Sequence, residues 1–132
     1  MSHITILIVD DSPNVRTLMR RLLTSVGYHV VEAADGYEAI RFARQHRPNV
    51  ILMDLGLPGM DGWEVTRRLR TEPALEDIPI IAVTGYDVST VAQTARRAGC
   101  QKVLFKPFNF DNLRRQIAVF ADATVTPSRT CS

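Results

Sequence analysis

The side chains best suited to chemistry are carboxylates that follow apolar runs. Asp10 and Asp11 end the first such run, Asp54 ends another, and Thr84 and Lys106 follow two later ones. Three carboxylates brought close together repel one another unless a cation lies among them, and carboxylate oxygens suit Mg²⁺. With a divalent ion and the Lys106 ammonium, the three aspartate charges would be balanced. The residue types therefore indicate a metal site among ionised carboxylates.

Five short, mostly β-branched runs and the segments between them must position these residues. The runs are nearly continuous in apolar character, which is typical of parallel strands covered on both faces. We predict strands over Ile4–Val9, His29–Ala33, Val50–Met53, Ile78–Val83 and Val103–Phe105. Helical spacing follows each run and is marked by Val15, Leu18, Leu22 and Val26, then Tyr37, Ile40 and Ala43, then Val65 and Leu69, then Val88, Val91, Ala92 and Ala95, then Leu113, Ile117 and Phe120.

Alternating strands and helices of this size predict an α/β fold with a doubly wound, five-stranded parallel sheet of flavodoxin-like order 2-1-3-4-5. In such sheets, ligands bind outside the carboxyl ends of the strands. That edge would collect the candidate residues.

Each candidate also has an ordinary structural interpretation. Asp11 or Ser12 could cap a helix that begins at Pro13, and Asp54 could be a turn residue. Thr84 could simply end a strand, and Lys106 could be a solvated surface residue. These interpretations would have to coincide at four strand ends, which favours a shared site.

The composition is that of one ordinary globular domain. The chain has 132 residues, 45% hydrophobic and 23% charged, with a net charge of +2. No apolar run approaches the ~18–20 residues that span a bilayer, and no signal peptide precedes the first strand, so we expect a cytoplasmic protein. Two cysteines are too few for a disulfide framework. Fourteen arginines accompany only two lysines.

The motifs resemble the receiver domain of two-component response regulators. The resemblance rests on Leu-Ile-Val-Asp-Asp, on Ile-Leu-Met-Asp-Leu-Gly-Leu-Pro-Gly-Met-Asp-Gly, on Ala-Val-Thr-Gly and on Phe-Lys-Pro-Phe. It covers residues 4–121. It implies that Asp54 accepts a phosphoryl group from a phosphohistidine of a sensor histidine kinase or a histidine phosphotransfer protein. It also implies no enzymatic activity beyond the protein's own aspartyl phosphorylation and dephosphorylation.

The resemblance assigns a role to each residue of the site. Mg²⁺ would be held by Asp11, by the Asp54 side chain and by the backbone carbonyl of Gly56, with Asp10 acting through water. Thr84 and Lys106 would contact the phosphoryl oxygens.

Three positions depart from the family pattern. Val103 stands where the family usually has an aromatic switch residue, which puts transmission by a swinging ring in doubt. Gly56 and Tyr86 flank the path of the hydrolytic water in the family. We hypothesise that Tyr86 partly covers the phosphoryl group while Gly56 offers no side chain to position water.

Partner surfaces are less defined. The family's usual output face, formed by its fourth helix, fifth strand and fifth helix, carries Arg96, Arg97, Lys102, Arg114 and Arg115. A solvated basic face is the simpler interpretation. If it is an interface, an acidic protein partner fits better than DNA, and no membrane partner is expected. Arg16, Arg20 and Arg21 could serve kinase docking.

We expect a stand-alone receiver over residues 1–121, followed by a poorly ordered polar tail over 122–132, so output would pass through protein binding or onward relay. The alternative is a scaffold or sequestering protein that keeps the fold without depending on phosphorylation, and Val103 is its only support. A flavin-binding protein is a distant third, because the first strand–helix turn has acids where a phosphate cradle needs Gly, Ser or Thr. Trp63 offers a fluorescence reporter near the Asp54 loop.

Overall fold

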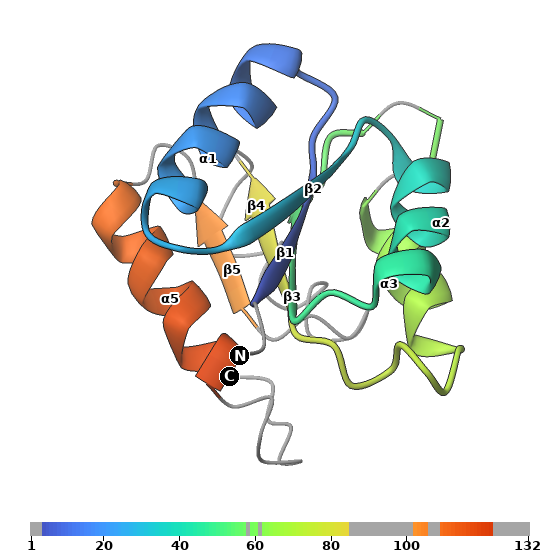
Figure 1. Ribbon diagram of the computed structural model, residues 1–132. Coiled ribbons are helices and arrows are strands. Elements are labelled where there is room, and N and C mark those ends of the chain that lie inside the picture. Colours follow the sequence, from blue (N-terminus) through green and yellow to red (C-terminus); the bar gives the residue numbers. More distant parts are fainter. Residues whose placement is uncertain (1–3, 58, 61, 85–101, 106–108, 123–132) are drawn as a thin grey trace.

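The sheet and its two helical layers are clear in the computed structural model, which describes residues 4–57, 59–60, 62–84, 102–105 and 109–122. Five parallel strands lie in the order β2-β1-β3-β4-β5, which confirms the predicted topology. Helices α1 and α5 cover one face of the sheet, and α2 and α3 cover the other (Figure 1). Within the described ranges, no helix combines the length and apolar character needed to cross a membrane.

The strands lie within two residues of their predicted bounds. They are β1 (Thr5–Val9), β2 (His29–Ala33), β3 (Val50–Asp54), β4 (Ile80–Thr84) and β5 (Lys102–Phe105). The largest difference is at β4, which begins two residues later than predicted. The Ile78 N–H donates to the Leu75 carbonyl in a turn, at 3.2 Å, and Pro79 has no N–H to offer a strand partner. Apolar character alone therefore extended the predicted strand too far.

Alternate strand residues supply two separate core layers. Ile6 and Ile8 of β1 pack with α1 and α5, whereas Leu7 and Val9 pack with α2 and α3. The strands are thus buried on both faces, as their nearly continuous apolar sequences predicted.

Helix α1 (Pro13–Ser25) begins as its sequence predicts. The Ser12 hydroxyl accepts from the Val15 N–H at 3.3 Å, and Pro13 occupies the first turn, where its missing N–H costs nothing. Ser12, rather than Asp11, is therefore the cap. After the helix, Gly27 adopts a φ of +102°, the left-handed conformation in which a helix commonly stops.

The apolar residues that mark α1 are not the ones it buries. Met19 and Leu23 face the core, while Val15, Leu18 and Val26 are 37%, 58% and 45% exposed. The spacing predicted the helix correctly but marked a face that remains largely at the surface.

Three further helices complete the described layers: α2 (Gly36–His46), α3 (Gly62–Arg70) and α5 (Phe110–Asp122). Asp35 caps α2 by accepting from the Glu38 N–H at 2.8 Å. The Glu38 carboxylate in turn accepts from the Ala34 N–H at 2.7 Å, so two end donors are satisfied together.

Several predictions fall outside the described residues. They concern the helix expected over 88–99, the proposed Tyr86 cover, Lys106, both cysteines and residues 123–132 of the polar tail. The tail was predicted to begin at Asp122, but this residue ends α5.

Candidate metal centre

Three carboxylates meet at the carboxyl edge of the sheet. Asp10 and Asp11 directly follow β1, and Asp54 ends the neighbouring β3. One carboxylate oxygen from each lies within 4.8 Å of the others. The structure thus brings together the three aspartates that the sequence predicted as a cluster.

Asp10 is the most firmly held of the three, with only 6% of its surface exposed. Its N–H donates to the Ala33 carbonyl at 3.1 Å, and its Oδ1 accepts from the Ser12 N–H at 2.9 Å. Its own carbonyl accepts from Arg16 Nη1 at 2.6 Å. Asp11, by contrast, is exposed. The cluster therefore combines an anchored carboxylate with one that faces solvent.

Asp54 is half-buried, and its surroundings are tightly packed. Its Oδ1 accepts from the Gly56 N–H at 3.2 Å, which ties the side chain to the loop that follows β3. A Cβ on Gly62, the first residue of α3, would lie 2.8 Å from the Asp54 carbonyl oxygen and 3.0 Å from Leu55 Cα. Since both atoms belong to the backbone, only glycine lets α3 approach Asp54 this closely.

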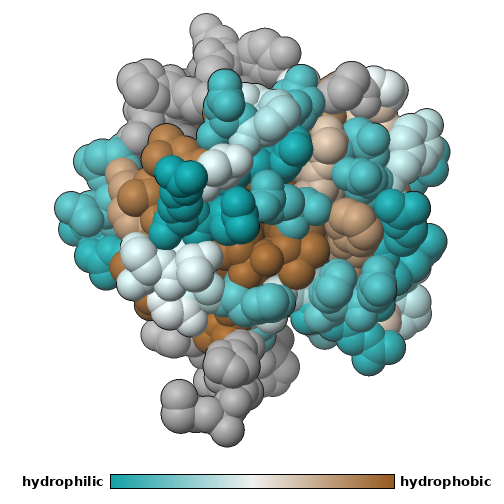
Figure 2. Space-filling view, turned by 45° about the horizontal axis from the view of Figure 1, so that its top comes forward, coloured by the Kyte–Doolittle hydropathy of each residue, from teal (hydrophilic) through white to brown (hydrophobic). Residues whose placement is uncertain are grey.

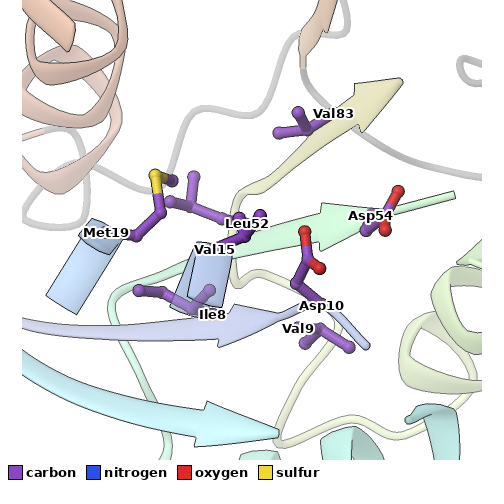
Figure 3. Close-up of a pocket in the computed structure, with 8 residues that line it drawn as sticks. All are labelled: Ile8, Val9, Asp10, Val15, Met19, Leu52, Asp54 and Val83. Atoms are coloured by element: carbon purple, nitrogen blue, oxygen red, sulfur yellow. The ribbon is translucent and has the colours of Figure 1, made fainter. Parts of the chain in front are cut away.

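A small cavity of about 30 Å³ lies beneath Asp10 and Asp54. Figure 3 shows these two carboxylates at the ends of neighbouring strands, with apolar side chains around them. The rest of the lining is apolar: Ile8, Val9, Val15, Met19, Leu52 and Val83. These apolar side chains offer no ligand atoms, so among the side chains that line the cavity only Asp10 and Asp54 could contact a cation.

The donor set fits Mg²⁺, which takes oxygen ligands at about 2.0–2.1 Å in octahedral geometry and usually keeps several waters. Opposite ligands are then about 4.2 Å apart. Oxygens separated by up to 4.8 Å fit when one carboxylate binds through a water molecule. The three aspartates therefore present oxygen ligands that fit a magnesium ion.

The other predicted site residues are placed only in part. Thr84 ends β4, whose Val83 pairs in register with Asp54, so its backbone lies at the same edge of the sheet. Gly56 is exposed in the loop after β3. Lys106 directly follows β5 in sequence and lies outside the described residues.

Two contributors to this edge could not be predicted from the sequence. Arg16 was expected only as a docking residue, but its guanidinium donates to the Asp10 carbonyl. Gly62 lies in the motif around Asp54, and its close approach to the Asp54 carbonyl was not expected. Neither contact leaves a sequence signal beyond the residue type, because each depends on how α1 or α3 crosses the strand ends.

The surface formed by α2 and α3 carries paired charges. Hydrogen bonds from Arg68 and Arg67 lower the pKa of Glu64, and a hydrogen bond from Arg44 lowers the pKa of Glu72. Arg44 belongs to α2 and Glu72 to the segment after α3, so this pair joins the two. An open cleft of about 310 Å³ lies here, lined by Tyr37, Ile40, Arg41, Arg44, Arg68, Thr71 and Glu72.

Comparisons with known proteins agree with the geometry. The response regulator receiver domain family matches residues 6–118. The polar-differentiation response regulator DivK of Brucella anthropi is 37% identical over 105 residues, which are 80% of this chain and 85% of DivK. The chemotaxis protein CheY4 of Vibrio cholerae superposes with a TM-score of 0.86 at 31% identity, covering 90% of this chain and 99% of CheY4.

A third comparison bears on the metal. The receiver domain of a sensor histidine kinase from Pseudomonas aeruginosa has a TM-score of 0.84 and 35% identity, covering 92% of this chain and 99% of that domain. Its structure holds a magnesium ion coordinated in the active-site cleft.

Proposed function

Because this chain belongs to the response regulator receiver domain family, we propose that Asp54 accepts a phosphoryl group from a phosphohistidine on a protein donor. Receiver domains are regulatory modules of two-component signalling, rather than classical enzymes, and phosphorylation with Mg²⁺ is general among them. The observation that carries the proposal is the convergence of three carboxylates within 4.8 Å at the carboxyl edge of the sheet.

Each residue has a role in the proposed transfer. An Asp54 carboxylate oxygen bonds to phosphorus as the phosphorus–nitrogen bond breaks, and the electron pair of that bond returns to the donor imidazole. Asp11, Asp54 and the Gly56 carbonyl would hold Mg²⁺, with Asp10 acting on it through water. Bound Mg²⁺ supplies positive charge to the phosphoryl oxygens, which is the main requirement of such a reaction. Thr84 and Lys106 contact the same oxygens.

The exposed side of α1 supports docking of the donor. Val15 lines the cavity beside the carboxylates, and Leu18 and Val26 continue the apolar stripe along the helix. Figure 2 shows apolar surface among the hydrophilic side chains on the α1 side of the molecule. Arg21, next to Leu22 in the sequence of the same helix, is exposed as well. The surface around the donor's phosphohistidine, on a kinase or a phosphotransfer protein, is the occupant we propose.

Output is proposed to pass through another protein in the cytoplasm, with this receiver acting alone. Lys102 of β5 and exposed Arg114 and Arg115 of α5 would meet an acidic partner surface. Arg96 and Arg97, assigned to the same face from the sequence, lie outside the described residues. The modest net charge of +2 favours a protein partner over DNA.

Phosphotransfer tests the proposal directly. Phosphorylated donor proteins from the host are mixed with the parent and with Asp54→Asn, and the label on the receiver is measured with and without Mg²⁺. Label should appear only on the parent and only with Mg²⁺. The matched control is Asp77→Asn, an exposed aspartate that precedes β4 at the opposite end of the strands, which should accept label like the parent.

Trp63 separates the two candidate functions. It packs against the core directly after Gly62, which lies against the Asp54 carbonyl, so its fluorescence should respond to Mg²⁺ and to beryllofluoride. A response that disappears in Asp54→Asn supports the phosphoacceptor. An Asp54→Asn variant that still pulls down the partner with unchanged affinity would instead support a phosphorylation-independent scaffold.

A further inference from the structure

Arg16 links the acidic edge to the outer strand of the sheet. From α1, its Nη1 donates to the Asp10 carbonyl at 2.6 Å and its Nε donates to Glu32 Oε1 at 3.3 Å. Only 16% of the Arg16 side chain is exposed, against 51% for Arg20, which bonds the same glutamate at 2.9 Å. The Arg16 side chain is thus largely buried and makes two hydrogen bonds, unlike an ordinary surface arginine.

The register explains why this contact acts on Asp10. Glu32 of β2 pairs with Ile8 of β1, two residues before Asp10. The Glu32 carboxylate holds the guanidinium, and the guanidinium holds the Asp10 carbonyl at the point where the chain leaves β1. The Asp10 carboxylate is fixed from the other side by the Ser12 N–H. The turn that carries Asp10 and Asp11 is therefore anchored at both ends.

Two opposing effects on Mg²⁺ follow from this placement. The positive charge of Arg16 repels a nearby cation, so on charge alone its removal would strengthen metal binding. Its bond to the Asp10 carbonyl keeps the aspartate turn in place, so on geometry its removal would weaken binding. Glu32 offsets much of the charge, whereas nothing replaces the bond, so geometry should prevail.

We propose that Arg16, oriented by Glu32, is a positioning residue of the metal site and holds Asp10 and Asp11 toward Asp54. This inference rests on the proposed function, since it assumes that the aspartates bind Mg²⁺. Residues that orient metal ligands typically contribute 10–100-fold to affinity. Since Arg16 holds a backbone carbonyl rather than a ligand atom, we expect about tenfold, the lower end of that range.

Mg²⁺ titrations of four proteins test the proposal, followed by Trp63 fluorescence and by backbone amide shifts. Arg16→Met should bind Mg²⁺ about tenfold more weakly than the parent. Arg16→Lys keeps the charge but not the guanidinium fork, so it should lose about threefold. The control Arg20→Met removes a guanidinium that also pairs with Glu32, and it should change the affinity for Mg²⁺ by less than about twofold.

The outcomes divide cleanly. Unchanged or tighter Mg²⁺ binding by Arg16→Met, or equal weakening in Arg20→Met, overturns the positioning role. Absence of Mg²⁺ binding in the parent would instead contradict the proposed function itself. Urea unfolding establishes that each variant is folded in the titration, and if Arg16→Met does not fold, Arg16→Lys against Arg20→Met decides the question.

Discussion

The outer surfaces of the two helical layers differ in kind. On one side, Leu18 of α1 and Val26, which directly follows this helix, leave apolar side chains in solvent. On the opposite side, Arg67 and Arg68 pair with Glu64, and Arg44 joins α2 to Glu72. Both layers bury apolar residues against the sheet, so the difference lies at the outer surfaces. The charge pairs of α2 and α3 suit a surface that stays in water, although Tyr37 of α2 is also exposed, whereas the apolar side chains along α1 fit the donor docking proposed above.

The sides of the two layers that face the sheet are both apolar and buried. The largest predicted effect, on the free energy of unfolding, tests whether they contribute equally to stability. Leu23 of α1 and Leu69 of α3 are both fully buried. Leu23→Ala and Leu69→Ala should each lower the free energy of unfolding by about 2–5 kcal/mol, since both leave a cavity. Leu18→Ala, on the exposed side of α1, should change it by about 0.5 kcal/mol or less. Urea unfolding measures all three, and a large loss in Leu18→Ala would place Leu18 in the core.

The second largest predicted effect, on the rate of phosphotransfer, tests whether the outer surface of α1 differs in function from that of α2. Leu18→Asp puts a charge in the apolar stripe of α1 and should slow phosphotransfer from a protein donor about tenfold, a cost of about 1.4 kcal/mol at one docking residue. Tyr37→Asp is the matched control on α2, where the side chain is 64% exposed. It should change transfer by less than about twofold.

A small phosphodonor, acetyl phosphate, distinguishes docking from chemistry. Leu18→Asp should be phosphorylated by it at the parent rate, because no docking surface is involved. Equal slowing with both donors would assign Leu18 to the reaction site rather than to the interface.

The smallest effect concerns the charge pairs of the α2–α3 surface. The hydrogen bond from Arg44 lowers the pKa of Glu72, so the ionised pair stabilises the fold above the unfolded pKa of about 4.3 and is lost as the pH falls through the lower folded value. Glu72→Gln should lower the Tm at pH 7 by about 2 °C or less, because the pair is exposed. Thermal melts of the two proteins should converge as the pH falls through the folded pKa of Glu72, and a gap that persists once Glu72 is protonated would mean another interaction was lost.

Much of the fold followed from local patterns. Continuous apolar runs predicted strands buried on both faces, and Ser12 with Pro13 predicted the start of α1, since each signal comes from residues adjacent in sequence. The clustering of Asp10, Asp11 and Asp54 was also predictable, because parallel strands deliver their ends to one edge.

The rest depended on how helices cross the sheet. Leu18 and Met19 differ by one position on α1, yet one is 58% exposed and the other 8% exposed. Hydrophobicity alone does not decide which of two adjacent apolar residues faces the core. The bond of Arg16 to Asp10 and the approach of Gly62 to Asp54 are likewise set by tertiary packing.

Val15 lines the cavity beside the carboxylates, and it is also the first residue of the exposed apolar stripe of α1. If the donor covers that stripe, a substitution at this position alters partner choice and the chemistry of the aspartates together. Pathway fidelity and reaction rate would then be genetically linked here. Leu18 and Val26, farther along the helix, would be the positions at which specificity can diverge between paralogous receivers without altering the aspartate cluster.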